Sequence, residues 1–130
     1  MVTKEDIESF LDRIDSGTAS VSEVERNTYI VKTVGGAEVV VHYAPPVVIL
    51  RVTVMTLPAA TPRRSELLRE LLELNARDLV HGAYGLEGDK VVLTDTLELE
   101  NLDFNEFEAS FDSITLALAQ HLGALAPYRE

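Results

Sequence analysis

The chain has 130 residues, no cysteine and a formal net charge of −11 at neutral pH. The lack of cysteine excludes disulfide frameworks, thiolate zinc sites and cysteine nucleophiles, and the excess of acidic side chains argues against direct binding to nucleic-acid phosphates. The longest apolar run, residues 44–50, is too short to cross a membrane. We therefore expect a single domain over residues 1–130, in a cytoplasmic protein.

Charge is spread unevenly along the chain. Residues 61–81 carry four basic and four acidic side chains, whereas residues 82–130 carry two basic and ten acidic ones. This acidic C-terminal part, with Glu98 and Glu100, is a candidate contact for a basic segment of a partner protein. The alternative is that its carboxylates serve only to keep the protein soluble.

The N-terminal residues predict a short helix. Thr3 is a favoured helix cap, and apolar residues recur at helical spacing from Ile7 to Ile14. Ser16-Gly17 is expected to end this helix. Residues 18–27 are polar and show no clear pattern, so they are interpreted as a connection.

Three runs rich in β-branched residues follow and predict three antiparallel strands. Gly35-Gly36 tolerates the positive φ angles of a tight hairpin turn between the first two strands. Pro45-Pro46 cannot donate hydrogen bonds to a neighbouring strand and marks the next turn. The predicted strands are residues 28–34, 37–44 and 47–57.

The third of these strands alternates between an apolar face and a mixed face, which is typical of a central strand with one face in the core. The core face is expected to hold Val48, Leu50, Val52 and Val54. The mixed face is expected to hold Val47, Ile49, Arg51, Thr53 and Met55.

Residues 63–75 predict a helix with more leucine than one buried face requires. Thr61-Pro62 precedes it as a cap followed by proline at the first helical position. The apolar sector spans about 160° at roughly 100° per residue, whereas a surface helix buries a stripe of about 100°. One ridge consists of Leu67, Leu71 and Leu74, and a second of Leu68 and Leu72. The second ridge predicts a contact with more of the same chain or with another chain.

Asn75 falls within the apolar sector of this helix. The favoured interpretation is that it helps to end the helix, through a left-handed conformation or a local backbone hydrogen bond. A functional role is the alternative.

A second hairpin is predicted over residues 82–87 and 90–99, around Gly88-Asp89. Asp95 interrupts the apolar side of its second strand. A bulge, a carboxylate that faces a partner, or a twist of the strand each accounts for this residue.

The last predicted helix begins at Asp103, which forms a capping-box pattern with Glu106, and it is stopped by Pro127. Leu116 points away from its apolar stripe, so a monomer would leave this leucine in water. We therefore predict Leu68, Leu72 and Leu116 as contacts of a homodimer. The apolar stripe consists of Phe104, Phe107, Phe111, Ile114, Leu118, Leu122 and Leu125.

No catalytic or metal-binding signature is found. The three histidines lack the short spacings of metal sites, and the glycines of residues 82–88 are not followed by the Lys-Ser/Thr of a phosphate loop. His121 is expected to have a structural role. Ser65, Ser110 and Ser113 are interpreted as helix-surface serines. Paired carboxylates such as Glu106 and Glu108 lack a pocket that would raise one pKa, so an enzyme is the least favoured class and no cofactor is expected.

The predicted order α-β-β-β-α-β-β-α favours an α+β fold, an antiparallel sheet with helices packed on it. Two segments carry a family resemblance: residues 67–75, which precede a glycine-rich strand, and residues 91–99, which lead into the last amphipathic helix. Because of these two segments, the order of the elements and the acidic charge, the chain resembles the YbjN-like family. The fold of that family is similar to that of type III secretion chaperones of the Tir type.

This resemblance implies a small acidic cytosolic homodimer that binds protein segments and has no enzyme activity. In secretion chaperones, partner chains wrap around the dimer through apolar patches and added strands. The corresponding candidates here are Val47, Ile49 and Met55 on the mixed strand face, together with the first helix. The expected partner is a protein with a basic or amphipathic segment. An acidic regulatory protein that docks on a basic partner, such as one that handles nucleic acid, is the alternative.

Overall fold

The computed structural model describes residues 1–14 and 18–129. Its elements confirm the predicted α+β class and add one strand to the predicted order. The predicted end of the first helix at Ser16-Gly17 lies outside the described residues. In chain order the elements are α1 (Lys4–Arg13), β1 (Thr18–Glu25), β2 (Thr28–Thr33), β3 (Glu38–Ala44), β4 (Val47–Thr56), α2 (Thr61–Arg77), β5 (Ala83–Glu87), β6 (Lys90–Glu98), α3 (Phe104–Leu125) and the 3-10 helix η1 (Ala126–Tyr128).

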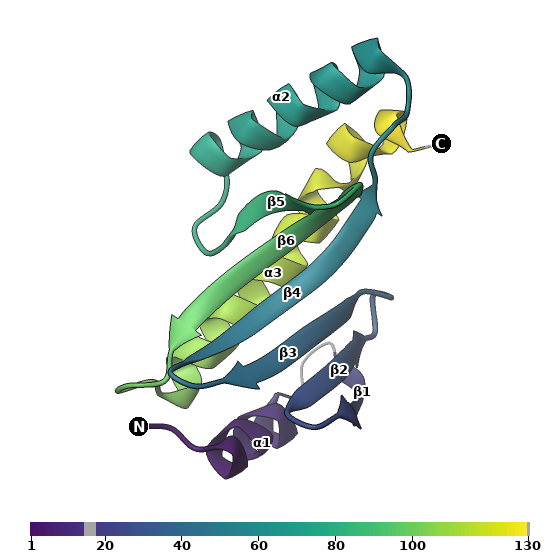
Figure 1. Ribbon diagram of the computed structural model, residues 1–130. Coiled ribbons are helices and arrows are strands. Elements are labelled where there is room, and N and C mark those ends of the chain that lie inside the picture. Colours follow the sequence, from purple (N-terminus) through teal and green to yellow (C-terminus); the bar gives the residue numbers. More distant parts are fainter. Residues whose placement is uncertain (15–17, 130) are drawn as a thin grey trace.

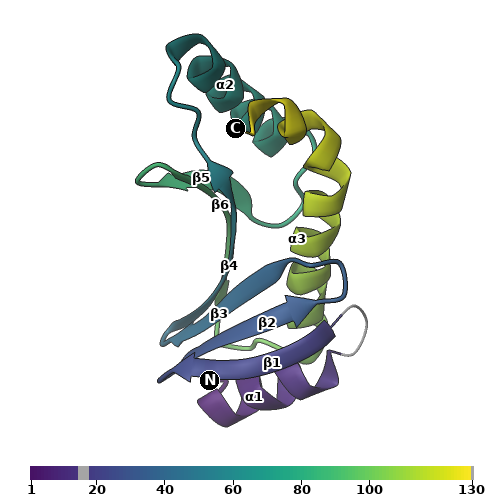
Figure 2. The ribbon, with the colours of Figure 1, turned by 90° about the vertical axis from the view of Figure 1, so that its right-hand side faces the viewer.

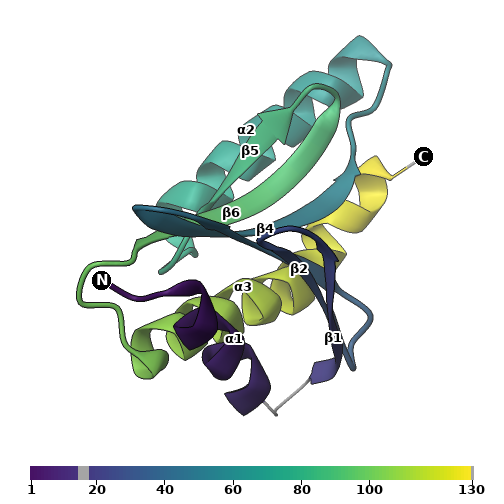
Figure 3. The same ribbon diagram turned by 60° about the horizontal axis from the view of Figure 1, so that its bottom comes forward.

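The strands form one antiparallel sheet in the order β1-β2-β3-β4-β6-β5. α3 runs along one face of this sheet, and α2 lies at the opposite end from α1, next to β5 (Figure 1, Figure 2). Figure 3 shows α1 and α3 on the same side of the sheet, where Phe10 of α1 contacts Phe104 and Phe107 of α3.

One hydrophobic core joins all three helices to the sheet. Phe107 and Phe111 of α3 are buried against the sheet, and Leu67 brings α2 into the same cluster. The predicted caps of the first and last helices are confirmed: the backbone N–H of Asp6 donates to Thr3, and that of Glu106 donates to Asp103.

The interpretation of residues 18–27 as a connection is wrong, because β1 occupies most of this stretch. β1 pairs along β2 with a register shift near each end. Val21 and Val24 are exposed, so pairing with β2, and not an apolar face, makes this segment a strand. Sequence periodicity carries little signal for a strand of this kind.

α2 differs from its prediction at both ends. Ala60 occupies the N-cap position and no side chain caps the helix, so the predicted Thr61 cap is wrong, although Pro62 lies in the first turn. The helix continues to Arg77, and Asn75 therefore does not end it.

The alternation of buried and more exposed side chains along β4 changes near the end of the strand. The pairing with β6 shifts between Thr53 and Met55, as in a β-bulge. Met55 is consequently only 9 % exposed and belongs to the core, whereas Val54 is half-buried. The predicted place of Met55 on the open face is thus wrong.

α3 buries a stripe that is rotated from the predicted one. Ser110, Ala117 and His121 are buried, while Leu122, predicted within the stripe, is 55 % exposed. The helix ends at Leu125, before Pro127, as predicted.

Candidate protein-binding surfaces

The two leucine ridges of α2 have different environments. Leu67, Leu71 and Leu74 are buried, as predicted for the first ridge. Leu68 is half-buried and packs against the core, whereas Leu72 is 68 % exposed. The fold therefore covers only part of the second ridge, and Leu72 lies on the surface.

The C-terminal half of α3 presents a second uncovered apolar surface. Leu116 is 58 % exposed, and Ala119, Gln120 and Gly123 are exposed around it. Residues 113–125 contain no aspartate, glutamate, lysine or arginine. An exposed surface without charge, in a chain of net charge −11, has the composition of a contact site.

Val47 and Ile49 lie on the face of β4 opposite the buried residues Val48 and Leu50. Both are half-buried. Glu98 of β6 is the register partner of Val47, so the structure brings two of the predicted partner contacts together. The result is a small apolar area with a carboxylate at its border.

Glu100 follows β6 and is exposed. One of its carboxylate oxygens lies 4.0 Å from the N-terminal amine. An exposed pair of this kind contributes little to stability, so Glu100 is available to a basic group.

Asn75 ties α2 to the outer edge of β5. Its Nδ2 donates to the carbonyl of Tyr84 at 3.1 Å, and its Oδ1 accepts from the N–H of Tyr84 at 2.7 Å. Sequence reasoning missed this pair, because the two residues belong to different elements and a helical asparagine has many possible partners.

Tyr84 continues this network into α3. Its hydroxyl lies 2.7 Å from Nδ1 of His121, and Nε2 of His121 lies 3.4 Å from a carboxylate oxygen of Asp78 at the end of α2. His121 is 4 % exposed. Burial, followed by the charge of Asp78, raises the pKa of Tyr84 to about 12. The hydroxyl of Tyr84 is therefore neutral at physiological pH, and the two contacts of His121 connect α3 to β5 and to the end of α2.

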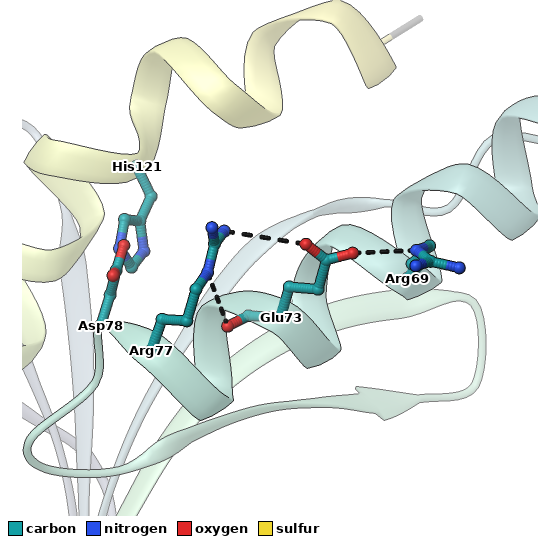
Figure 4. Close-up of polar contacts among 5 residues, drawn as sticks. All are labelled: Arg69, Glu73, Arg77, Asp78 and His121. Carbon is teal, nitrogen blue, oxygen red and sulfur yellow. Dashed lines mark hydrogen bonds and ion pairs between the residues drawn. The ribbon is translucent and has the colours of Figure 1, made fainter.

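Figure 4 shows Asp78 beside His121, and the charged side chains of α2 on the neighbouring turns. Glu73 lies between Arg69, at 2.9 Å, and Arg77, at 3.9 Å. These pairs follow the i, i+4 spacing of a helix surface and are exposed, so each adds a few tenths of a kcal/mol at most, about 0.3–0.5.

Asp95 and Ser110 form a further pair that sequence reasoning missed. The hydroxyl of Ser110 donates to the carboxylate of Asp95. Ser110 is buried, so its interpretation as a surface serine is wrong. This bond explains why a carboxylate interrupts the apolar side of β6: Asp95 satisfies a buried hydroxyl of α3.

Carboxylates also gather in a hollow between α1, β1 and β2, lined by Glu8, Asp12, Glu23 and Tyr29 among others. The hydroxyl of Tyr29 donates to Glu8 at 2.8 Å, and Lys4 lies 3.0 Å from Glu23. Burial and this bond to Glu8 raise the pKa of Tyr29. Two of the three carboxylates thus connect the first helix to the sheet.

A groove opens between β3, β4 and α3, with a volume of about 660 Å³. The turn at Gly35-Gly36 and the start of β3 form one wall, and Val52, Thr53 and Val54 of β4 form the other. Leu118 and Leu122 of α3 also line it. No sequence feature indicated this groove.

Comparison with protein-family models finds CesT_Tir_1, whose model matches residues 1–130. The chain belongs to the CesT_Tir_1 family. A comparison with curated proteins finds no match.

Solved structures share the fold of this CesT_Tir_1 protein. YbjN from E. coli is 14 % identical with a TM-score of 0.66, over 95 % of this chain and 96 % of that chain. A chain of the ExoU–SpcU complex from the type III secretion system of Pseudomonas aeruginosa is 16 % identical with a TM-score of 0.61, over 95 % and 98 %. A chain of the HopA1–SchA chaperone–effector complex is 11 % identical with a TM-score of 0.61, over 86 % of each chain. The predicted fold of the YbjN and secretion-chaperone type is thereby confirmed.

The described residues of this CesT_Tir_1 protein give no sign of a metal centre. Among residues 1–14 and 18–129, no group of three or more histidine, aspartate or glutamate side chains is arranged to hold a metal ion. His42 lies on the surface, with its Nδ1 2.8 Å from the hydroxyl of Thr28. No described helix is long and apolar enough to span a bilayer.

Proposed function

We propose that this protein is a homodimeric, non-catalytic binding module of the cytoplasm that holds segments of a partner protein. The observation that carries the proposal is the pair of leucines, Leu72 and Leu116, that a single copy of the chain leaves exposed. Membership of the CesT_Tir_1 family and the chaperone-like fold support it.

The dimer contact is proposed on α2 and the C-terminal half of α3, through Leu68, Leu72 and Leu116. Two copies of net charge −11 repel each other except where the surface is neutral. Residues 61–81 carry equal numbers of acidic and basic side chains, and residues 113–125 carry none. These two segments are therefore where copies can approach at the lowest electrostatic cost.

The client contact is proposed on the open face of β4, through Val47 and Ile49, with Glu98 and Glu100 at its acidic border. A segment that suits this surface has apolar residues beside lysine or arginine. Such a segment buries its apolar side chains on the sheet and places its charges near the carboxylates. The acidic surface attracts the segment, and the apolar contact holds it.

Affinity capture from the native cell tests the proposal. A tagged wild-type chain is compared with Ile49→Lys, which places a like charge against a basic segment, and with Ala109→Lys, which makes the same change in charge at an exposed position in the N-terminal half of α3. We expect one or a few proteins that wild type and Ala109→Lys retain and that Ile49→Lys loses. If Ile49→Lys retains the same proteins as wild type, the proposed client surface is wrong.

The second candidate is an acidic regulatory protein that docks on a basic partner. The charge of residues 82–130, two basic against ten acidic side chains, favours it. The same captured partner separates the two candidates through the salt dependence of its binding.

A further inference from the structure

The groove between β3, β4 and α3, named here the α3 groove, carries opposite charges at its two ends. Its lining residues with formal charge are Glu38, at the start of β3, and Arg129, which follows η1. Figure 2 shows the turn before β3 level with the middle of α3, whereas α3 ends and η1 follows at the far end, beside α2. The α3 groove therefore has an acidic end, a basic end and an uncharged middle.

Both charged groups are available to a partner. Glu38 lies 3.9 Å from Lys32, and both side chains are more than half exposed, so this pair holds the carboxylate only weakly. Arg129 is exposed, and among residues 1–14 and 18–129 no carboxylate pairs with its guanidinium. Each group can thus gain from an opposite charge outside its own chain.

The uncharged middle of the α3 groove continues onto the open side of α3. Leu118 and Leu122 line the groove, and the next positions around the helix, at about 100° per residue, are Ala119, Gly123 and Leu116. Leu122 and Leu116 are 55 % and 58 % exposed, and a Cβ on Gly123 would meet no atom within 4 Å. One copy of the chain therefore leaves small residues uncovered between two exposed leucines.

A second copy of the chain matches this arrangement. A two-fold interface is self-complementary, because a contact of one residue with another is repeated in the reverse sense. From these observations we infer that a second copy closes the α3 groove, with its α3 antiparallel to the first and with Glu38 of each copy facing Arg129 of the partner subunit. The exposed leucines of each α3 then cover the apolar middle of the other groove.

The charge of the whole chain favours this occupant. Each copy carries −11, so two copies repel each other over most of their surface. Residues 113–125 have no charge, and the lining of the α3 groove has one charge of each sign. A basic client segment would gain at Glu38 but would be repelled at Arg129, so it suits this groove less well.

The inference rests on the proposed function, because it gives the homodimer a geometry and adds Glu38 and Arg129 to its contact. Val47 and Ile49, the proposed client contacts, do not line the α3 groove. The proposed client surface therefore stays free in this dimer.

Charge reversal tests the two reciprocal pairs. Glu38→Arg removes one negative charge and adds one positive charge, so the net charge changes from −11 to −9 and general repulsion between copies falls. Specific pairing predicts the opposite effect, because the new arginine would face Arg129 of the partner subunit twice in each dimer. We expect sedimentation equilibrium at physiological salt to show a rise of about tenfold in the Kd of the dimer.

The double variant Glu38→Arg/Arg129→Glu restores both the net charge and the opposite signs of each pair. Its Kd should return to within about twofold of the wild-type value. Both residues are exposed in one copy, so the variants should fold, which circular dichroism checks.

Cross-linking of mixed variants tests the orientation of the two copies. The chain has no cysteine, so Glu38→Cys and Arg129→Cys each introduce a single thiol. A short bismaleimide should join these two variants when they are mixed, and a denaturing gel should show a species of twice the chain mass. Neither variant should cross-link by itself, because the antiparallel arrangement separates equal positions. Asp89→Cys removes the same charge at the exposed β5–β6 turn and, mixed with Arg129→Cys, should not cross-link.

Three results would overturn the inference: an unchanged or lower Kd for Glu38→Arg, no cross-link between Glu38→Cys and Arg129→Cys, or cross-linking of Arg129→Cys with itself. If the wild type is dimeric and one of these results is found, the homodimer stands and only the reciprocal pairing is wrong. A wild type that remains monomeric would contradict both.

Discussion

Asn75 occupies the position beside Tyr84 that a further strand would take at the outer edge of β5, since its side-chain amide bonds to both the N–H and the C=O of that residue. An unpaired sheet edge invites association with other strands. α2 therefore closes the β5 edge at this point.

Asn75→Ala should destabilise the protein. The substitution leaves two backbone groups of the buried Tyr84 without partners, which costs about 1–3 kcal/mol. Urea unfolding followed by circular dichroism measures the loss. Gln120→Ala, at an exposed helical position, is the control and should change the free energy of unfolding by less than about 0.5 kcal/mol. Equal effects of the two substitutions would show that the Asn75–Tyr84 contact does not stabilise the fold.

The pKa of Tyr84 predicts a specific loss of stability in alkali. In the folded state it is about 12, whereas an unfolded tyrosine has a pKa of about 10. The folded state holds this proton more tightly, so the stabilisation is complete below about pH 10 and is lost as the pH rises towards about 12. The free energy of unfolding of the wild type should therefore fall faster with pH than that of Tyr84→Phe in this window. Parallel curves would contradict the assignment.

Gly82 and Gly85 should respond differently to alanine. Gly82 has a φ of +78°, and a Cβ there would lie 2.5 Å from the carbonyl oxygen of Thr94, whereas a Cβ on Gly85 would meet no atom within 4 Å. We expect Gly82→Ala to cost at least about 1 kcal/mol, because alanine is strained at positive φ. Gly85→Ala should cost less than about 0.5 kcal/mol. Thermal unfolding compares the two, and similar melting temperatures would contradict the close approach of Gly82 to β6.

Salt dependence should separate the two candidate functions. Exposed charges are screened beyond about 8 Å at physiological ionic strength, whereas apolar contacts are not screened. If the open face of β4 carries the contact, the Kd of the captured partner should change less than about threefold from low to high salt. A steep weakening with salt would favour docking of the acidic residues 82–130 on a basic partner.

Much of the fold follows from local sequence patterns. The caps at Thr3 and Asp103, the turns at Gly35-Gly36 and Gly88-Asp89 and the period of the leucine helix each depend on residues close together in the chain, and all agree with the structure. The exposure of Leu72 and Leu116 could also be predicted from the sequence. The helical period shows which apolar residues lie outside the one face that a helix buries.

The missed features depend on contacts between distant segments. Ser110 and His121 are buried because Asp95 and Tyr84, from two other elements, supply hydrogen-bond partners. β1 has no apolar face of its own, and the groove between β3, β4 and α3 depends on where two strands separate. A linear pattern records none of these, since each is decided by packing across the sheet.

The mass of the particle in solution tests the central claim most directly. Size-exclusion chromatography with light scattering, at tens of micromolar protein, should give about 28.6 kDa, twice the 14.3 kDa of one chain. The double variant Leu72→Glu/Leu116→Glu should shift towards 14.3 kDa while remaining folded, because both side chains are exposed in one copy. A wild-type protein that stays at 14.3 kDa across this range would contradict the homodimeric binding module.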